Sequence, residues 1–288
     1  MYPWIDYGGR FSPLRATVFV ALFLPALYTI VLFPFGWLGP RPVTEAIHNI
    51  GLWTIRFIFL ALAITPARQI LDWRRLIEVR RMIGVAAFFY VCFHFLLFIA
   101  DEAFDLRTVA SEIVLRIYLT IGFIALIGLA TLAATSTDGM LRRLGRRWQK
   151  LHTIVYGIAV LALIHFFMQS KADVWEPIWM AGLYGWLMGW RILARWTKRG
   201  QAMPLWRLAA LGIAAGVLTA FGEAAYWWFM RGIPVMRVID SNFTTALGVR
   251  PSWIVLGVGL AAVLAAAGRR LIPSPSPARS RASAARGA

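Results

Sequence analysis

The sequence predicts an all-α protein, a polytopic transmembrane helical bundle of about eight helices with both termini in the cytoplasm, and three observations predict it. Hydrophobic residues make up 60% of the 288 positions and charged residues only 15%, whereas a soluble domain carries about 25% charged residues. Apolar stretches recur at lengths close to the ~20 residues that cross a bilayer. Basic residues gather in every second connection between these stretches. A single water-soluble domain is therefore excluded.

Eight apolar stretches form the predicted bundle. The first is too long and uninterrupted for a cleaved signal peptide, so we expect a retained helix. The sixth and the eighth are short and must extend into their flanks to cross a bilayer. In chain order the stretches are 16–35, 46–64, 82–100, 113–134, 151–168, 178–193, 208–230 and 253–267.

The net charge of +17 is a topology signal in a chain of this kind. Most of the 30 basic residues lie in five alternate segments, which the positive-inside rule assigns to the cytoplasm. They occupy short gaps and build no soluble basic face, so we expect contact with membrane lipid and no nucleic-acid partner. The five segments are 1–15, 65–81, 135–150, 191–207 and 268–288.

The connections are too short to fold as soluble domains. None exceeds about 25 residues, and neither a GxGxxG nor a GxxxxGK phosphate-binding motif is present. A redox protein of this design must receive electrons from a separate partner or from a lipid-soluble carrier. Cys92 is the single cysteine, which excludes a disulfide framework and a cysteine-ligated zinc or iron–sulfur site within one chain.

Two of the four histidines are predicted at the same depth. His94 lies 12 residues into the third stretch, at ~18 Å, and His165 lies 14 residues into the fifth, at ~21 Å. Both stretches enter from the cytoplasmic side, so both imidazoles reach the outer half. That arrangement is the one that bis-imidazole ligation of haem iron requires in a helical bundle. The alternative is a structural hydrogen bond to a neighbouring helix.

The other two histidines have less support as ligands. His152 begins the fifth stretch on the cytoplasmic side, and no second histidine lies at its depth, so a second haem there needs a weaker or partner-derived ligand. His48 begins the second stretch on the outer side and is an alternative ligand or a propionate partner.

Several charged residues also need an explanation. Arg56 lies inside the second stretch, where a haem propionate or a structural carboxylate is its expected partner, and Glu223 raises the same question in the seventh. A group of cytoplasmic arginines is a candidate flavin-phosphate or reductase docking site, or else a set of topology determinants near lipid headgroups. These arginines are Arg80, Arg81, Arg146 and Arg147.

Several segments resemble a known family. The stretch from Thr135 through Trp148 and His152 to His165 is similar to the haem-binding membrane subunits called MsrQ, formerly YedZ, of the ferric-reductase-like transmembrane superfamily. Ile64-Thr-Pro, Arg80-Arg-Met-Ile-Gly and Phe93-His, together with His48, match as well. The resemblance covers about residues 15–197.

The resemblance implies a b-type cytochrome of the bacterial inner membrane, with the matches of His94 and His165 as haem ligands and that of His152 implicated in haem binding. It implies electron transfer to a periplasmic molybdopterin enzyme, MsrP, that reduces methionine sulfoxide in oxidised proteins and so repairs them. Flavin mononucleotide (FMN) is a further implied cofactor, and the implied donors are the quinone pool or a cytoplasmic flavin reductase. Substrate chemistry is then expected in the partner.

The resemblance also divides the chain. We expect a cytoplasmic N-terminus at 1–15, a haem-binding core at 16–199, an additional helix pair at 200–272 and a disordered cytoplasmic tail at 273–288. Two alternatives stay open. One is a cytochrome that reduces ferric iron or another metal directly, for which a fused flavin and nicotinamide domain is missing. The other is a transporter with structural histidines, although no convincing repeat of broken helices is present.

Overall fold

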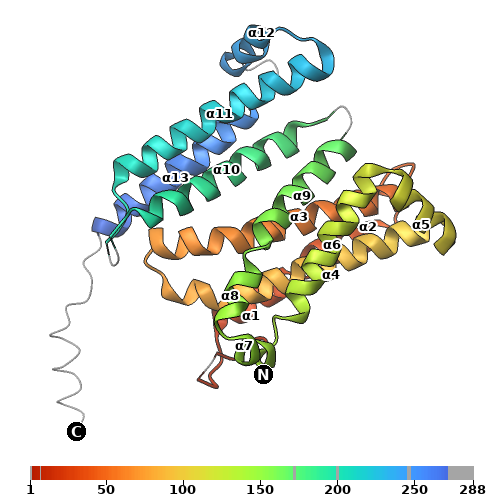
Figure 1. The fold of residues 1–288 in the computed structure, drawn as a ribbon, viewed down its shortest axis with the longest axis horizontal. Coiled ribbons are helices and arrows are strands. Elements are labelled where there is room, and N and C mark those ends of the chain that lie inside the picture. The colour runs from red at the N-terminus through yellow and green to blue at the C-terminus, as the bar shows by residue number, and fades with distance from the viewer. Residues whose placement is uncertain (1, 7, 171–172, 199–200, 245–247, 272–288) are drawn as a thin grey trace.

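The computed structural model describes residues 2–6, 8–170, 173–198, 201–244 and 248–271, and this part of the chain is helical. Its only strand-like pairing is an isolated bridge between Ile5 and Phe11 within the described ranges. The expected tail at 273–288 lies outside the described residues. The all-α fold class is therefore confirmed (Figure 1).

Thirteen α-helices follow one another in the described residues. They are α1 (Pro13–Ala21), α2 (Leu24–Leu32), α3 (Pro42–Ile70), α4 (Ile77–Asp101), α5 (Leu106–Leu115), α6 (Ile117–Ala134), α7 (Asp138–Leu144), α8 (Arg146–His152), α9 (Val155–Gln169), α10 (Trp175–Arg195), α11 (Leu205–Arg231), α12 (Val235–Asp240) and α13 (Pro251–Leu271).

Seven helical segments of the described chain are long and apolar enough to cross a membrane, which confirms a polytopic membrane protein. They are Pro13–Leu32, Pro42–Ile70, Arg74–Asp101, Ile117–Ala134, Arg146–Gln169, Leu205–Arg231 and Pro251–Leu271. The predicted stretch 178–193 forms α10, whose 21 residues reach ~31 Å. Its polar and glycine content lowers its hydropathy, yet Trp186 and Trp190 are buried in the bundle.

The structure corrects one predicted helix start. The stretch 113–134 is not one helix, because Arg116 adopts an extended conformation (φ −106°, ψ 104°) and separates α5 from α6. The Arg116 guanidinium pairs with Glu112 and donates to the Tyr118 hydroxyl at 3.3 Å. The membrane helix therefore begins at Ile117, and the four residues before it belong mainly to α5, whose outward residues Val114 and Leu115 are exposed.

The bundle has two neighbouring groups of helices. Helices α3, α4, α6 and α9 form one group, and α10, α11 and α13 lie side by side in the other (Figure 1). Helix α10 joins them because it packs against α3 and α9 as well as α11 and α13. Helices α11 and α13 cross closely: a Cβ added to Gly212 would lie 3.1 Å from the Gly259 Cα, so small residues bring these backbones together.

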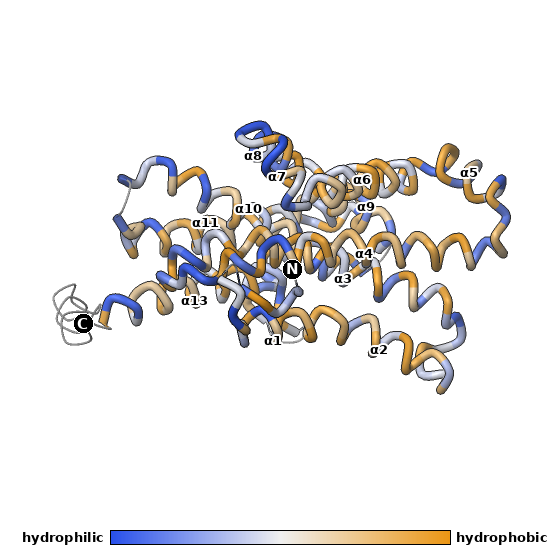
Figure 2. Tube along the Cα trace, turned by 90° about the horizontal axis from the view of Figure 1, so that it is seen from below, coloured by the Kyte–Doolittle hydropathy of each residue, from blue (hydrophilic) through white to orange (hydrophobic). Residues whose placement is uncertain are grey.

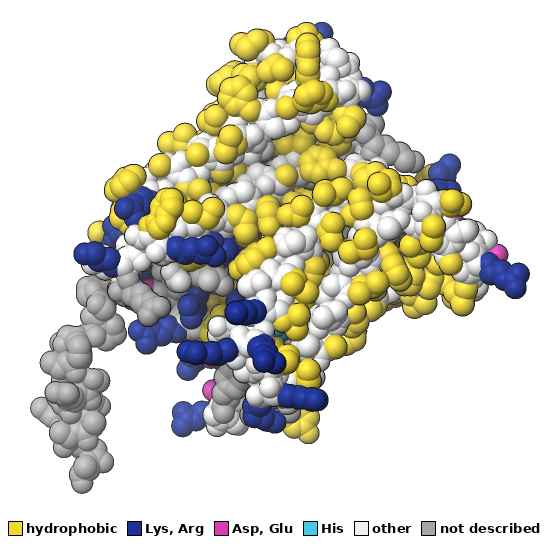
Figure 3. All heavy atoms as spheres, viewed as in Figure 1, with side chains coloured by type: hydrophobic (Ala, Val, Ile, Leu, Met, Phe, Trp, Pro, Cys, Tyr) yellow, Lys and Arg dark blue, Asp and Glu magenta, His cyan; other side chains and the backbone are white. Residues whose placement is uncertain are grey.

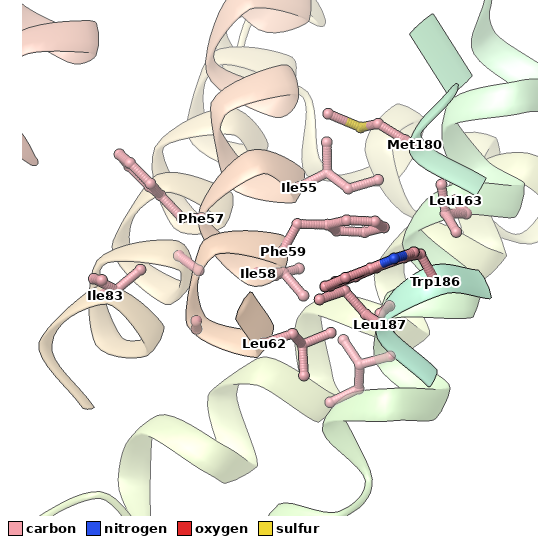
Figure 4. Packing of buried hydrophobic residues seen from close by; sticks show 14 of the residues in the cluster. Ile55, Phe57, Ile58, Phe59, Leu62, Ile83, Leu163, Met180, Trp186 and Leu187 are labelled. Atoms are coloured by element: carbon pink, nitrogen blue, oxygen red, sulfur yellow. The ribbon is translucent and has the colours of Figure 1, made fainter. Parts of the chain in front are cut away.

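The core forms where the two groups meet. Ile58, Phe59 and Leu62 of α3 lie against side chains of α9 and α10, among them Leu163, Met180 and Leu187 (Figure 4). Many large apolar residues are exposed on the membrane helices, such as Leu60, Phe89 and Leu218. An apolar exterior is what lipid contact requires.

The polar residues lie mainly at the ends of the long helices. Figure 2 shows hydrophobic stretches along the long helices and hydrophilic residues at α7, α8 and the last turns of α13. Figure 3 shows most of the visible Lys and Arg side chains gathered at that same end of the bundle, at the lower left. The predicted alternation of charge therefore corresponds to one basic end in space. Assigning that end to the cytoplasm stays a prediction.

Candidate functional site

Two imidazole rings face each other between α4 and α9. The ring centroids of His94 and His165 are 6.3 Å apart, and the ring planes are nearly perpendicular at 86°. Each histidine stands in the last third of its helix, on the side opposite the basic end. Both side chains are partly buried. The two histidines that the sequence placed at a common depth are therefore neighbours.

Each ring is held by a backbone carbonyl from an adjacent helix. His94 Nδ1 lies 2.8 Å from the carbonyl oxygen of Ile47 in α3, and His165 Nδ1 lies 2.8 Å from that of Tyr118 in α6. A carbonyl oxygen only accepts, so each Nδ1 carries the proton and donates it. Each Nε2 therefore keeps an available lone pair, which is the state of a metal-binding imidazole.

The donor set fits a metal with two axial imidazoles. A ring nitrogen binds a transition metal at about 2 Å, so two rings on opposite sides of one metal have centroids about 6 Å apart. The observed separation is 6.3 Å. Within the described ranges no group of three or more His, Cys, Asp or Glu side chains could hold a metal ion. The pair thus suits a metal whose remaining ligands come from a cofactor such as haem.

The other two histidines are not part of this ring pair. The His152 ring stacks on Trp148 at 3.8 Å between centroids, and its Nε2 lies 3.2 Å from the Thr135 hydroxyl oxygen. His48 is solvent-exposed, on α3. No second histidine lies beside His152, as the sequence indicates.

The two membrane-embedded charges both have protein partners. Arg56 donates from Nε and Nη2 to one carboxylate oxygen of Glu176, at 3.1 and 2.7 Å, and lies over the Trp53 ring. This ion pair is the structural alternative that the sequence left open for Arg56. Glu223 in α11 pairs with Arg250, just before α13.

The four arginines at the basic end do not form one cluster of equivalent side chains. Arg81 pairs with Asp138 at 2.5 Å, and this contact holds the pKa of the Asp138 carboxyl below its ordinary value. Arg80 is partly buried, whereas Arg146 and Arg147 are exposed on α8. Arg81 is therefore already paired with a carboxylate of the chain.

Sequence reasoning missed the residues that hold the histidines. The carbonyl groups of Ile47 and Tyr118 carry no side-chain signature, since any residue supplies a carbonyl. In the structure each carbonyl residue precedes its histidine by the same 47 positions. The equal spacing shows that the two helix pairs have similar geometry.

Comparisons with known proteins identify a family. Residues 50–163 match the family model for the ferric reductase like transmembrane component. Three relatives are each called "Protein-methionine-sulfoxide reductase heme-binding subunit MsrQ". The Rhodospirillum rubrum protein is 42% identical over 187 residues, which is 64% of this chain and 90% of the relative.

The second relative, from Herminiimonas arsenicoxydans, is 39% identical over 65% of this chain and 88% of the relative. For the third, from Xanthomonas euvesicatoria, the values are 43%, 56% and 75%. No solved structure gives a significant match. With about 40% identity across most of these relatives' lengths, the chain belongs to the MsrQ family of methionine-sulfoxide reductase subunits.

Proposed function

We propose that this chain is a haem-binding electron-transfer subunit of a methionine-sulfoxide reductase system, with His94 and His165 as the axial ligands of one b-type haem. The facing imidazoles carry the proposal, since each has its Nδ1 proton fixed on a carbonyl and its Nε2 lone pair free. The name that the relatives share supports haem as the cofactor. A haem held in this way supplies one-electron chemistry at a potential set by its two axial ligands.

The residues around the pair orient the two imidazole rings and shield them from water. The Ile47 and Tyr118 carbonyls fix the tautomer and the ring plane, so both lone pairs are presented without reorganisation. Burial of Ile50 on α3 and of Leu163 on α9, close in sequence to Ile47 and His165, limits access of water. A dry, pre-organised site keeps the reorganisation energy of electron transfer low and protects a bound metal from side reactions.

The position of the pair supports a proposed direction of electron flow. The histidines lie toward the end opposite the basic one, so we propose that the acceptor docks there, on the periplasmic side of an inner membrane. An MsrP-like molybdopterin enzyme that reduces methionine sulfoxide is the proposed acceptor. The quinone pool or a cytoplasmic flavin reductase is the proposed donor, because the chain has no nucleotide-binding motif of its own.

The remaining proposals concern the basic end and the domain division. FMN is a second proposed cofactor. Of the four candidate arginines, Arg80, Arg146 and Arg147 take part in no ion pair of the described residues. We propose residues 16–199 as the haem-binding core and 200–272 as an added pair. The family model at residues 50–163 lies within the first of these, and the alignments with the relatives leave about a third of the chain uncovered.

The experiment is a reduced-minus-oxidised absorption spectrum with a pyridine haemochrome assay on the detergent-purified chain. We expect a b-type spectrum near one haem per chain, and loss of the low-spin signal in His94→Ala and in His165→Ala. His48→Ala is the matched control, because His48 is exposed on a neighbouring helix and should keep the signal. An unchanged spectrum in both ligand variants would refute the assignment, and absence of haem from the wild-type chain would favour the transporter.

A further inference from the structure

We infer that Gly51 and Gly122 are positioning residues. Because they lack a Cβ, they leave room for the imidazole rings of His94 and His165 to hydrogen-bond to a helix carbonyl. The inference rests on the proposed ligand role of His94 and His165. It adds two residues that neither the sequence pattern nor the similarity to relatives assigns to the site.

The space above each glycine is filled by an imidazole. A Cβ added to Gly51 would lie 2.8 Å from both Cε1 and Nδ1 of His94. A Cβ added to Gly122 would lie 2.8 Å from Nδ1 and 2.9 Å from Cε1 of His165. Real Cβ atoms do not approach ring atoms so closely, so any larger residue must displace the ring.

The hydrogen bond explains why glycine is needed at these positions. In an α-helix the carbonyl of residue i points along the axis toward the N–H of residue i+4. The Ile47 carbonyl thus points toward Gly51, and the Tyr118 carbonyl toward Gly122. A ring that uses the second lone pair of this carbonyl must lie beside residue i+4. The hydrogen bond to the carbonyl therefore depends on the absence of a Cβ at residue i+4.

This arrangement of carbonyl, glycine and histidine occurs in both helix pairs with the same spacing along the chain. In each helix pair the glycine follows the carbonyl residue by four positions, and the histidine follows the carbonyl residue by 47 positions. The two copies meet at the 6.3 Å ring separation. Moving either ring off its carbonyl would change that separation and free the Nδ1 proton, so both the ligand position and its basicity depend on the glycines.

Glycines on the two helices that carry the histidines provide matched controls. A Cβ added to Gly84 on α4 or to Gly157 on α9 meets nothing within 4 Å. Alanine there should be neutral or slightly stabilising, because alanine has the higher helix propensity. Gly51→Ala and Gly122→Ala make the same chemical change against a ring.

The first test is haem affinity and spectrum of the full-length chain. We expect Gly51→Ala and Gly122→Ala to lower haem affinity about 10-fold or more and to convert low-spin haem to high-spin, with a shifted midpoint potential. Gly84→Ala and Gly157→Ala should match the wild type in haem affinity, spin state and midpoint potential. Wild-type spectrum, affinity and potential in both Gly51→Ala and Gly122→Ala would overturn the inference.

A double-mutant cycle separates ring displacement from general misfolding. We expect Gly51→Ala to lower the thermal midpoint of the wild-type chain but not that of His94→Ala, which has no ring to displace. Gly122→Ala and His165→Ala form the second cycle. Equal destabilisation in both backgrounds would assign the glycines to helix packing and overturn the inference. If instead the ligand assignment fails, His94→Ala keeps the low-spin spectrum while the cycle still reports the glycine–ring contact.

Discussion

Arg191 of α10 donates a 2.6 Å hydrogen bond from Nη2 to the carbonyl oxygen of Leu62 in α3. This carbonyl has no helix partner, because the residue four positions later is Pro66, which lacks an N–H. A second donor of Arg191 reaches the carbonyl of its own helix at Leu187, at 2.8 Å. Arg191 therefore ties α10 to α3 at the point where the proline leaves the backbone unsatisfied.

Arg191→Leu should destabilise the bundle, because it leaves a carbonyl without a donor in an apolar environment. We expect a loss of about 1–3 kcal/mol in the free energy of unfolding, measured in detergent with increasing denaturant. Pro66→Ala restores the helix N–H for Leu62, so Arg191→Leu should cost less in that background. An equal cost in both backgrounds would mean that Arg191 stabilises α10 by another contact, such as its position over the Tyr156 ring.

The ion pair between Arg56 and Glu176 allows a test of what Arg56 does. Because its guanidinium is held by a carboxylate of the chain, Glu176→Gln should lower the thermal midpoint through an unpaired, partly buried cation. Haem content and midpoint potential should stay near the wild-type values. The exchange Arg56→Glu with Glu176→Arg is the control, and partial recovery of stability is expected. A large potential shift in Glu176→Gln alone would instead indicate that Arg56 serves a haem propionate.

How far the sequence predicts this molecule depends on the type of signal. Apolar length and charge alternation predict the membrane helices well, since the bilayer imposes both. The break at Arg116 escapes such a pattern, because apolar residues continue on both sides of it in α5 and α6. Depth counting brings His94 and His165 to one level. It cannot reveal the Ile47 and Tyr118 carbonyls, because any residue type supplies a carbonyl and only helix packing selects which one.

The contact between Arg81 and Asp138 predicts a pH dependence at the basic end. The pKa of Asp138 is lowered in the folded chain, chiefly by its hydrogen bond from Arg81. A carboxyl with a depressed folded pKa contributes stability above its unfolded pKa of about 4 and loses it as pH falls through the folded pKa. We expect the thermal midpoint to fall below about pH 4, and to fall less in Asp138→Asn. Identical pH profiles for the variant and the wild type would refute this linkage.

The crossing of α11 and α13 tests the proposed domain division. A Cβ added to Gly259 would lie 2.5 Å from the Gly212 Cα, so the contact is backbone against backbone and cannot relax by a side-chain rotation. Gly259→Val should therefore separate the two helices and cost about 1–3 kcal/mol in stability. Gly257→Ala, on the same helix with nothing within 4 Å of the added Cβ, should cost nothing.

The haem content of Gly259→Val then shows whether the added helix pair takes part in haem binding. If residues 16–199 bind haem independently, Gly259→Val should keep one haem per chain and the wild-type low-spin spectrum, although its thermal midpoint falls. Helix α10 packs against α3 and α9 as well as α11 and α13, and α13 also contacts α3, so damage at the crossing could reach the histidines through either helix. Parallel loss of haem and stability in Gly259→Val, with Gly257→Ala unchanged, would show that the added pair is part of the haem-binding core.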